Sequence, residues 1–159
     1  MDQSDRVRMT CGAATGLAGG VVAWAMSGSG GSLARFLPDG PWFHIAALLG
    51  AGVAGLALAD GFGRKGWLGA GAALAAAPVA TGIGAALGAA GLMVVFAAVQ
   101  FLAGAGGVAR GSVTGAPALG VLAVVDGIGT SPVVALTWVS AMCAVHLAMR
   151  RLRNAFEPG

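Results

Sequence analysis

The chain has 159 residues, of which 57% are hydrophobic and only 9% are charged, and its mean hydropathy is +0.85. Because soluble domains carry about 25% charged residues, this composition excludes a water-soluble fold. The formal net charge of +3 comes from scattered residues, and no tract of basic residues interleaved with aromatics supports nucleic acid as a partner. We therefore expect a single integral membrane domain over residues 1–159, with membrane lipid around it.

Apolar runs separated by turn signals predict an all-α fold with six transmembrane helices. These helices cover about residues 10–27, 42–60, 67–81, 84–108, 113–127 and 132–149. The connections include a Gly/Ser-rich loop at 27–32 and a Pro-Asp-Gly-Pro turn at 38–41.

The longest apolar run, Gly66–Ala109, has 44 consecutive residues without Asp, Glu, Lys, Arg or His. A single helix of that length would measure about 66 Å, whereas the hydrocarbon core of a bilayer is about 30 Å thick. Helix-breaking residues cluster at Thr81–Gly84, just after Pro78. The run is therefore predicted to turn at 81–84 and to form a buried helical hairpin.

Small residues recur at every fourth position of the first two predicted helices, and such faces allow close helix packing in lipid. They are Gly12, Gly16 and Gly20 in the first helix, and Ala47, Ala51, Gly55 and Ala59 in the second. We expect these Gly/Ala faces to pack the helices of this chain and to bind other integral membrane subunits.

The basic residues indicate a topology with both termini in the cytoplasm, as the positive-inside rule requires. Eight of the nine positive charges then fall on the cytoplasmic side, and Arg35 alone falls outside. The eight are Arg6, Arg8, Arg64, Lys65, Arg110, Arg150, Arg151 and Arg153. The chain has one Lys against eight Arg and no Tyr, a skew typical of GC-rich coding, which favours a bacterial inner membrane.

Three polar side chains are candidates for an ion path, because polar groups at membrane depth are costly. Asp60 and Asp126 lie at the ends of the second and fifth predicted helices, and Gln100 is the only strongly polar residue of the fourth. The alternative is structural: Asp60 pairs with Arg64 at a helix end, and Asp126 lies in a solvated turn.

The two histidines, His44 and His146, are candidate axial ligands for haem or chlorophyll. The predicted topology separates them by most of the bilayer, which excludes one bis-histidine site and favours interfacial roles. Cys11 and Cys143 are predicted to be buried small side chains, since the chain has no CxxC motif. We expect no cofactor and no metal site.

Two segments carry a family resemblance: Leu58-Ala59-Asp60 followed by Arg64-Lys65, and Ala109-Arg110-Gly111-Ser112-Val113-Thr114. Their order resembles the small type IV prepilin peptidases, which are bacterial inner-membrane aspartyl proteases. The resemblance implies that Asp60 and Ser112 occupy the positions of the two catalytic aspartates, both facing the cytoplasm. An aspartyl mechanism needs two carboxylates that share a proton, so Ser112 implies an inactive relative.

No HExxH, nucleophile-elbow or Walker motif occurs in the chain. The sequence therefore favours a non-enzymatic accessory, assembly or scaffolding subunit of a larger bacterial inner-membrane complex, of which respiratory and photosynthetic complexes are examples. The alternatives are a small transporter or channel that uses Asp60 and Asp126, and a catalytically inactive prepilin-peptidase-like protein.

Overall fold

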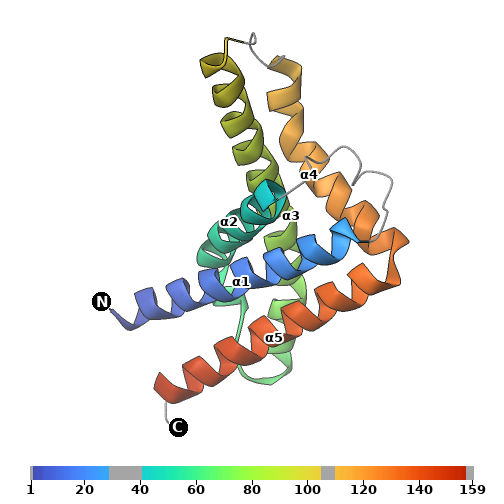
Figure 1. Ribbon diagram of the computed structural model, residues 1–159. Helices are drawn as coiled ribbons and strands as arrows, with labels where there is room; N and C mark the ends of the chain where they lie inside the picture. Colours follow the sequence, from blue (N-terminus) through green and yellow to red (C-terminus); the bar gives the residue numbers. More distant parts are fainter. Residues whose placement is uncertain (1, 29–40, 105–109, 157–159) are drawn as a thin grey trace.

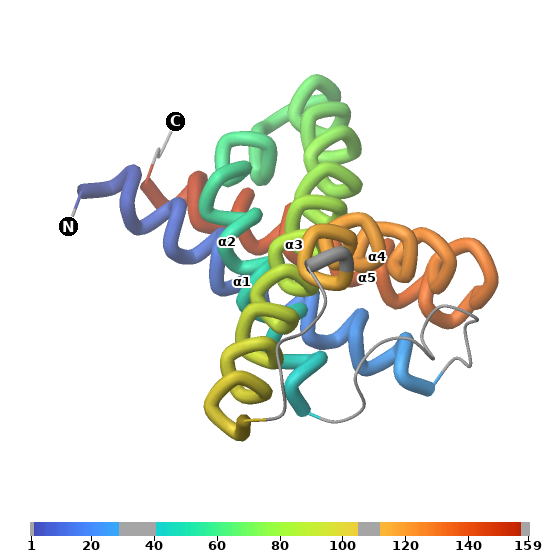
Figure 2. Tube along the Cα trace, turned by 90° about the horizontal axis from the view of Figure 1, so that it is seen from above, coloured from blue at the N-terminus to red at the C-terminus, as the bar shows by residue number. Residues whose placement is uncertain are grey.

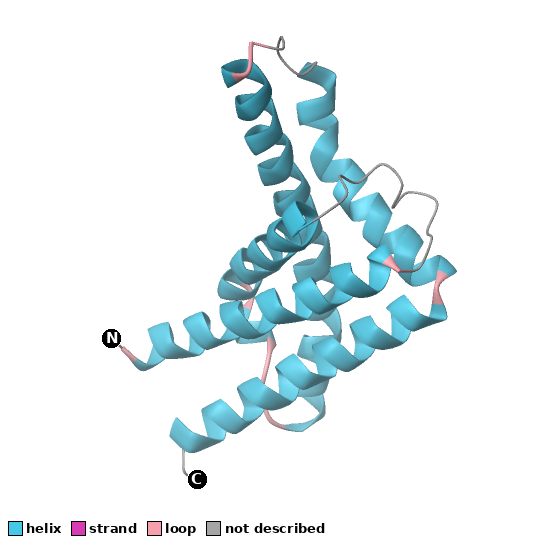
Figure 3. Ribbon diagram, in the orientation of Figure 1, coloured by secondary structure: helices cyan, strands magenta, loops and turns pink. Residues whose placement is uncertain are grey.

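The computed structural model describes residues 2–28, 41–104 and 110–156, without the side chains of residues 110 and 111. These residues form helices and short connections with no β-strand among them (Figures 1 and 3), which confirms the predicted all-α fold. The elements are α1 (Gln3–Ser27), α2 (Pro41–Ala57), the 3-10 turn η2 (Ala59–Gly61), α3 (Gly66–Leu102), α4 (Arg110–Thr130) and α5 (Pro132–Phe156).

Four of the described helices, α1, α3, α4 and α5, are long and apolar enough to cross a membrane, and α2 is shorter at 17 residues. The structure thus has five α-helices in its described ranges where the sequence predicts six. Arg35, most of the loop predicted at 27–32, the turn predicted at 38–41 except Pro41, and residues 105–108 of the predicted fourth helix lie outside the described residues.

The predicted hairpin within the long apolar run is wrong, because α3 continues through Pro78 and Thr81–Gly84 as one helix of 37 residues. Gly84, one of the residues that suggested a turn, packs α3 against α2 instead. A Cβ atom on Gly84 would lie 2.8 Å from the Cα atom of Ala51 in α2, so the missing side chain is what lets the two helices touch. The predicted hairpin places Arg64 and Arg110 on the same side of the membrane. In the structure Arg64 precedes the start of α3, whereas Arg110 begins α4, beyond the other end of α3.

Close glycine contacts join α1 and α2 as an antiparallel pair. A Cβ atom on Gly12 would lie 2.7 Å from Leu56 Cγ, and one on Gly19 would lie 2.5 Å from Ala51 Cβ. The regularly spaced glycines of α1 are therefore occupied within the chain, where backbones approach closely enough to gain van der Waals contact.

The start of α1 and the end of α5 lie on the same side of the molecule in both views (Figures 1 and 2). At this end, a cluster of buried residues packs α1, the α2–α3 loop and α5 against one another. Its members include Val7 and Cys11 of α1, Phe62 of the loop and Met149 of α5. A second cluster, which includes Val22 and Met26 of α1, packs the other end of α1 against α4 and the start of α5.

Helices α3 and α4 form a hairpin, and its far end, made by the end of α3 and the start of α4, extends away from the rest of the molecule (Figure 1). Gly120 of α4 packs on Ala85 and Ala89 of α3, so the two helices run antiparallel from the C-terminal end of α3. Figure 1 shows the end of α3 and the start of α4 standing apart from α1, α2 and α5.

Candidate functional site

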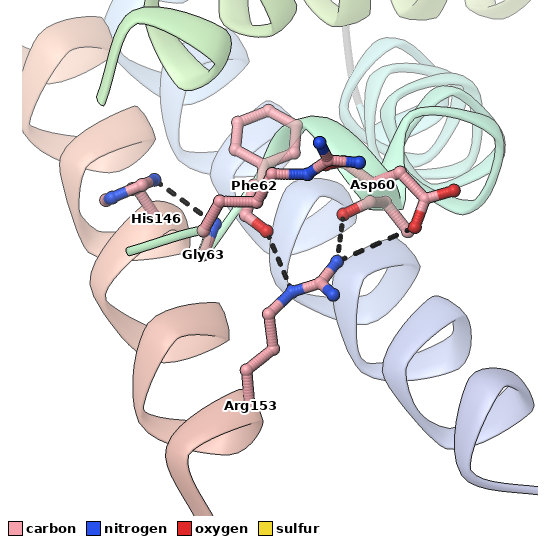
Figure 4. A network of polar contacts seen from close by, with 7 residues as sticks. Asp60, Phe62, Gly63, His146 and Arg153 are labelled. Carbon is pink, nitrogen blue, oxygen red and sulfur yellow. Dashed lines mark hydrogen bonds and ion pairs between the residues drawn. The ribbon is translucent and has the colours of Figure 1, made fainter. Parts of the chain in front are cut away.

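A network of polar contacts joins the α2–α3 loop to the C-terminal half of α5 (Figure 4). We call this group the polar junction and define it by Asp60, Gly63, His146 and Arg153, with the carbonyls of Ala59 and Phe62. It lies at the end of the molecule that carries both termini.

Arg153 is the centre of the polar junction. Its Nε atom donates to the carbonyl of Phe62 at 3.1 Å, and its Nη2 atom donates to the carbonyl of Ala59 at 3.0 Å. The Ala59 carbonyl also accepts the N–H of Phe62 at 3.3 Å, and Phe62 itself follows η2 as its C-cap residue. Arg153 therefore binds a carbonyl at each end of η2 from a helix more than ninety residues away along the chain.

Asp60 contributes less than Arg153, because its side chain is 73% exposed and its Oδ1 atom lies 3.7 Å from Arg153 Nη2. Water screens an exposed ion pair of this kind, which is worth about 0–1 kcal/mol. The sequence suggests Arg64 as the partner of this carboxylate, but Arg64 Nε donates to the backbone carbonyl of Asp60 at 2.7 Å. Asp60 thus lies at the surface of the junction.

His146 holds the loop at a second point. Its Nδ1 atom accepts the N–H of Gly63 at 3.2 Å. Gly63 has a φ of +77°, a conformation that favours glycine, and a Cβ atom there would lie 2.5 Å from the carbonyl carbon of Met149. The loop is therefore pressed against the backbone of α5.

Apolar side chains close the core behind the junction. Phe62, Met149 and Cys11 are each fully buried. The junction therefore closes one end of the helix bundle, with its charged side chains on the outer side of a buried apolar cluster. Both cysteines are free; Cys11 is buried as predicted, but Cys143 is exposed on α5 and not buried.

The structure does not bring the histidines together. His44 lies in the first turns of α2, where its Nε2 atom is 3.4 Å from the hydroxyl of Ser27 and its ring is 5.7 Å from that of Phe43. His146 lies at the polar junction, beside the opposite end of α2. Within the part of the chain that the structure describes, no three His, Cys, Asp or Glu residues form a group that could hold a metal ion.

The remaining candidates are spread along the α3–α4 hairpin. Asp60 precedes α3 and Gln100 lies near its C-terminal end, so about 50 Å of helix separates them at ~1.5 Å per residue. Ser112 lies in the first turn of α4, beyond the same distant end, and Asp126 lies in the last turns of α4. The structure therefore brings Asp60 next to neither Gln100 nor Ser112.

Sequence reasoning missed the role of Arg153, which it assigned only to the basic end of the last helix. The missed signal is Gly63 within Gly61-Phe62-Gly63, where glycines flank an aromatic residue in a polar loop and indicate close backbone packing. Comparison with protein-family models, curated proteins and solved structures finds no match to this chain.

Replacing Arg153 by Met should lower the free energy of unfolding by about 2 kcal/mol, because two hydrogen bonds from a charged donor are lost. Asp60→Asn should cost less than about 1 kcal/mol, since the ion pair is exposed. Arg151→Met, at an exposed position on the same helix, is the matched control and should have little effect. Unfolding in mixed micelles measures all three, and equal losses for Arg153→Met and Asp60→Asn would contradict this ranking.

Two glycines with nearly the same backbone conformation provide a matched pair, Gly63 at φ +77° and Gly66 at φ +76°. Gly66→Ala adds a Cβ atom in open space and should cost only the left-handed backbone penalty of about 1–2 kcal/mol. Gly63→Ala pays the same penalty and also drives its Cβ atom into the backbone of α5. We expect a clearly larger fall in thermal stability for Gly63→Ala, and equal falls would show that the loop does not press on α5.

Proposed function

We propose that this protein is a non-enzymatic accessory or scaffolding subunit of a larger complex in a bacterial inner membrane, and that the α3–α4 hairpin contacts its partner. The supporting observation is that α3 is long and that the apolar side chains near its C-terminal end are exposed. The polar junction is the place where chemistry could be expected, and its groups are engaged in holding the α2–α3 loop on α5.

The 37 residues of α3 give a helix about 55 Å long at ~1.5 Å per residue. Transmembrane helices tilt by up to about 40°, and at that tilt α3 still spans about 42 Å along the membrane normal, against a hydrocarbon core of about 30 Å. Part of α3 must then extend past the lipid chains. Apolar side chains on that part need a protein surface to cover them.

The C-terminal third of α3 is apolar and exposed. Its exposed large side chains are Val94, Val95, Phe96, Val99, Phe101 and Leu102. Phe101 and Leu102, at the tip, are 77% and 83% exposed. A contiguous exposed apolar patch of this kind marks a surface that binds protein or lipid, and its place at the projecting end of α3 favours protein.

The charges support an orientation with both termini in the cytoplasm. Seven of the nine basic residues of the chain lie in the elements that meet at the terminal end: Arg6, Arg8, Arg64, Lys65, Arg150, Arg151 and Arg153. The positive-inside rule places such an end in the cytoplasm, and the tip of the α3–α4 hairpin then points to the periplasm.

Photocrosslinking in the native membrane tests the proposal. A photoreactive amino acid in place of Val95 or Phe101 should give adducts with one recurring integral membrane protein. The same group in place of Trp24, which is 73% exposed on α1, serves as the control and should give that adduct at least several-fold less. Purification in mild detergent should recover the same protein in a fixed ratio.

Adducts with lipid alone at all three positions, together with a lone monomer after purification, would overturn the proposal. If a partner crosslinks to the Trp24 position as strongly as to the Phe101 position, the accessory role stands, but the claim that the hairpin makes the contact is wrong.

A further inference from the structure

The centre of the molecule contains a cavity of about 80 Å³ that all five helices line and that is partly open to the outside. Representative lining residues are Thr15 and Val22 of α1, Ala47 of α2, Gly88 of α3, Val124 of α4 and Trp138 of α5. None of the described lining residues is charged, and most of them are Gly or Ala, whose small size leaves the space that larger side chains would fill.

The polar atoms at the wall already have partners in the chain. The hydroxyl of Thr15 donates to the carbonyl of Cys11 at 2.8 Å, and that of Thr81 donates to the carbonyl of Ala77 at 2.7 Å. The indole N–H of Trp138 donates to Thr81 Oγ1 at 2.8 Å. A buried water needs two to four polar partners, and these three side chains leave it no free donor; none of the described lining residues is charged to balance an ion.

An apolar occupant is what this lining favours. Atoms that face a void lose their dispersion contacts on one side, and a hydrocarbon segment would restore them. A ligand with an anionic or hydrogen-bond-accepting group inside the cavity would lose its own hydrogen bonds, because the donors of the three polar side chains are already used.

We propose that the cavity binds the end of one acyl chain of a membrane phospholipid. Phospholipid would surround the protein, since four of the described helices are long and apolar enough to lie in lipid. An acyl chain can reach the cavity because the cavity is partly open. The chain end enters, while the phospholipid headgroup stays outside. This inference does not depend on the proposed partner of the α3–α4 hairpin.

Quenching of Trp138 fluorescence by brominated phospholipid tests the site. The chain has four tryptophans, and the other three are exposed, so Trp24, Trp42 and Trp67 can be replaced by Phe. In bilayers of phosphatidylcholine brominated near the ends of its acyl chains, we expect the emission of Trp138 to fall by half or more relative to unbrominated lipid.

Two variants should block the cavity from different helices, Ala85→Leu on α3 and Ala46→Leu on α2, both at lining positions. Each should reduce the quenching of Trp138 at least twofold. The same substitutions in a protein whose only tryptophan is Trp24 form the matched control, and quenching of that exposed residue should not change. Equal quenching of Trp138 with and without the blocking residues would overturn the proposal.

If neither variant folds, native mass spectrometry of the unblocked protein decides. Retention of about one phospholipid per chain after extensive delipidation supports the site. A folded chain that sheds all of its lipid overturns it.

Discussion

The close approach of α2 and α3 through glycine is the contact on which the rest of the structure depends. Gly50 lies directly against the backbone of Gly84 and Gly88, and a Cβ atom on Gly88 would lie 2.7 Å from the carbonyl oxygen of Ala46. In lipid, two apolar helices gain no hydrophobic free energy when they associate. Van der Waals contact between closely packed backbones therefore has to drive the association of such helices. This contact falls in the region of α3 where the sequence suggests a turn and where the helix is continuous.

Once α3 is continuous, the positions of the other elements follow. The polar junction lies at its N-terminal end, where Arg153 and His146 of α5 hold the α2–α3 loop. The C-terminal end of α3 extends beyond α1, α2 and α5 and is accompanied by α4 (Figure 1). The molecule therefore has a basic end that carries both termini and an apolar end that projects from it.

The sequence predicts the features of this fold that follow from composition and local spacing. It does not predict those that depend on contacts between residues distant in the chain. The scarcity of charge correctly indicates apolar helices, and the spacing of Gly12 and Gly16 correctly marks a packing face. The break at Thr81–Gly84 is wrong because Gly and Pro give the same local signal for a turn and for a close helix contact. Only the partner helix, with Ala51 against Gly84, distinguishes these two uses. The role of Arg153 depends in the same way on carbonyls that are distant in sequence.

The continuity of α3 is the central claim, and the distance between its two ends tests it most directly. Spin labels can be placed at Trp67 and Leu102, which are 82% and 83% exposed, after Cys11 and Cys143 are replaced by Ala. Pulsed electron paramagnetic resonance in nanodiscs should give a distance of about 50 Å, as 35 residues of helix at ~1.5 Å each require. A distance below about 20 Å, which antiparallel packing at an interaxial distance of about 8–10 Å would give, would contradict the account.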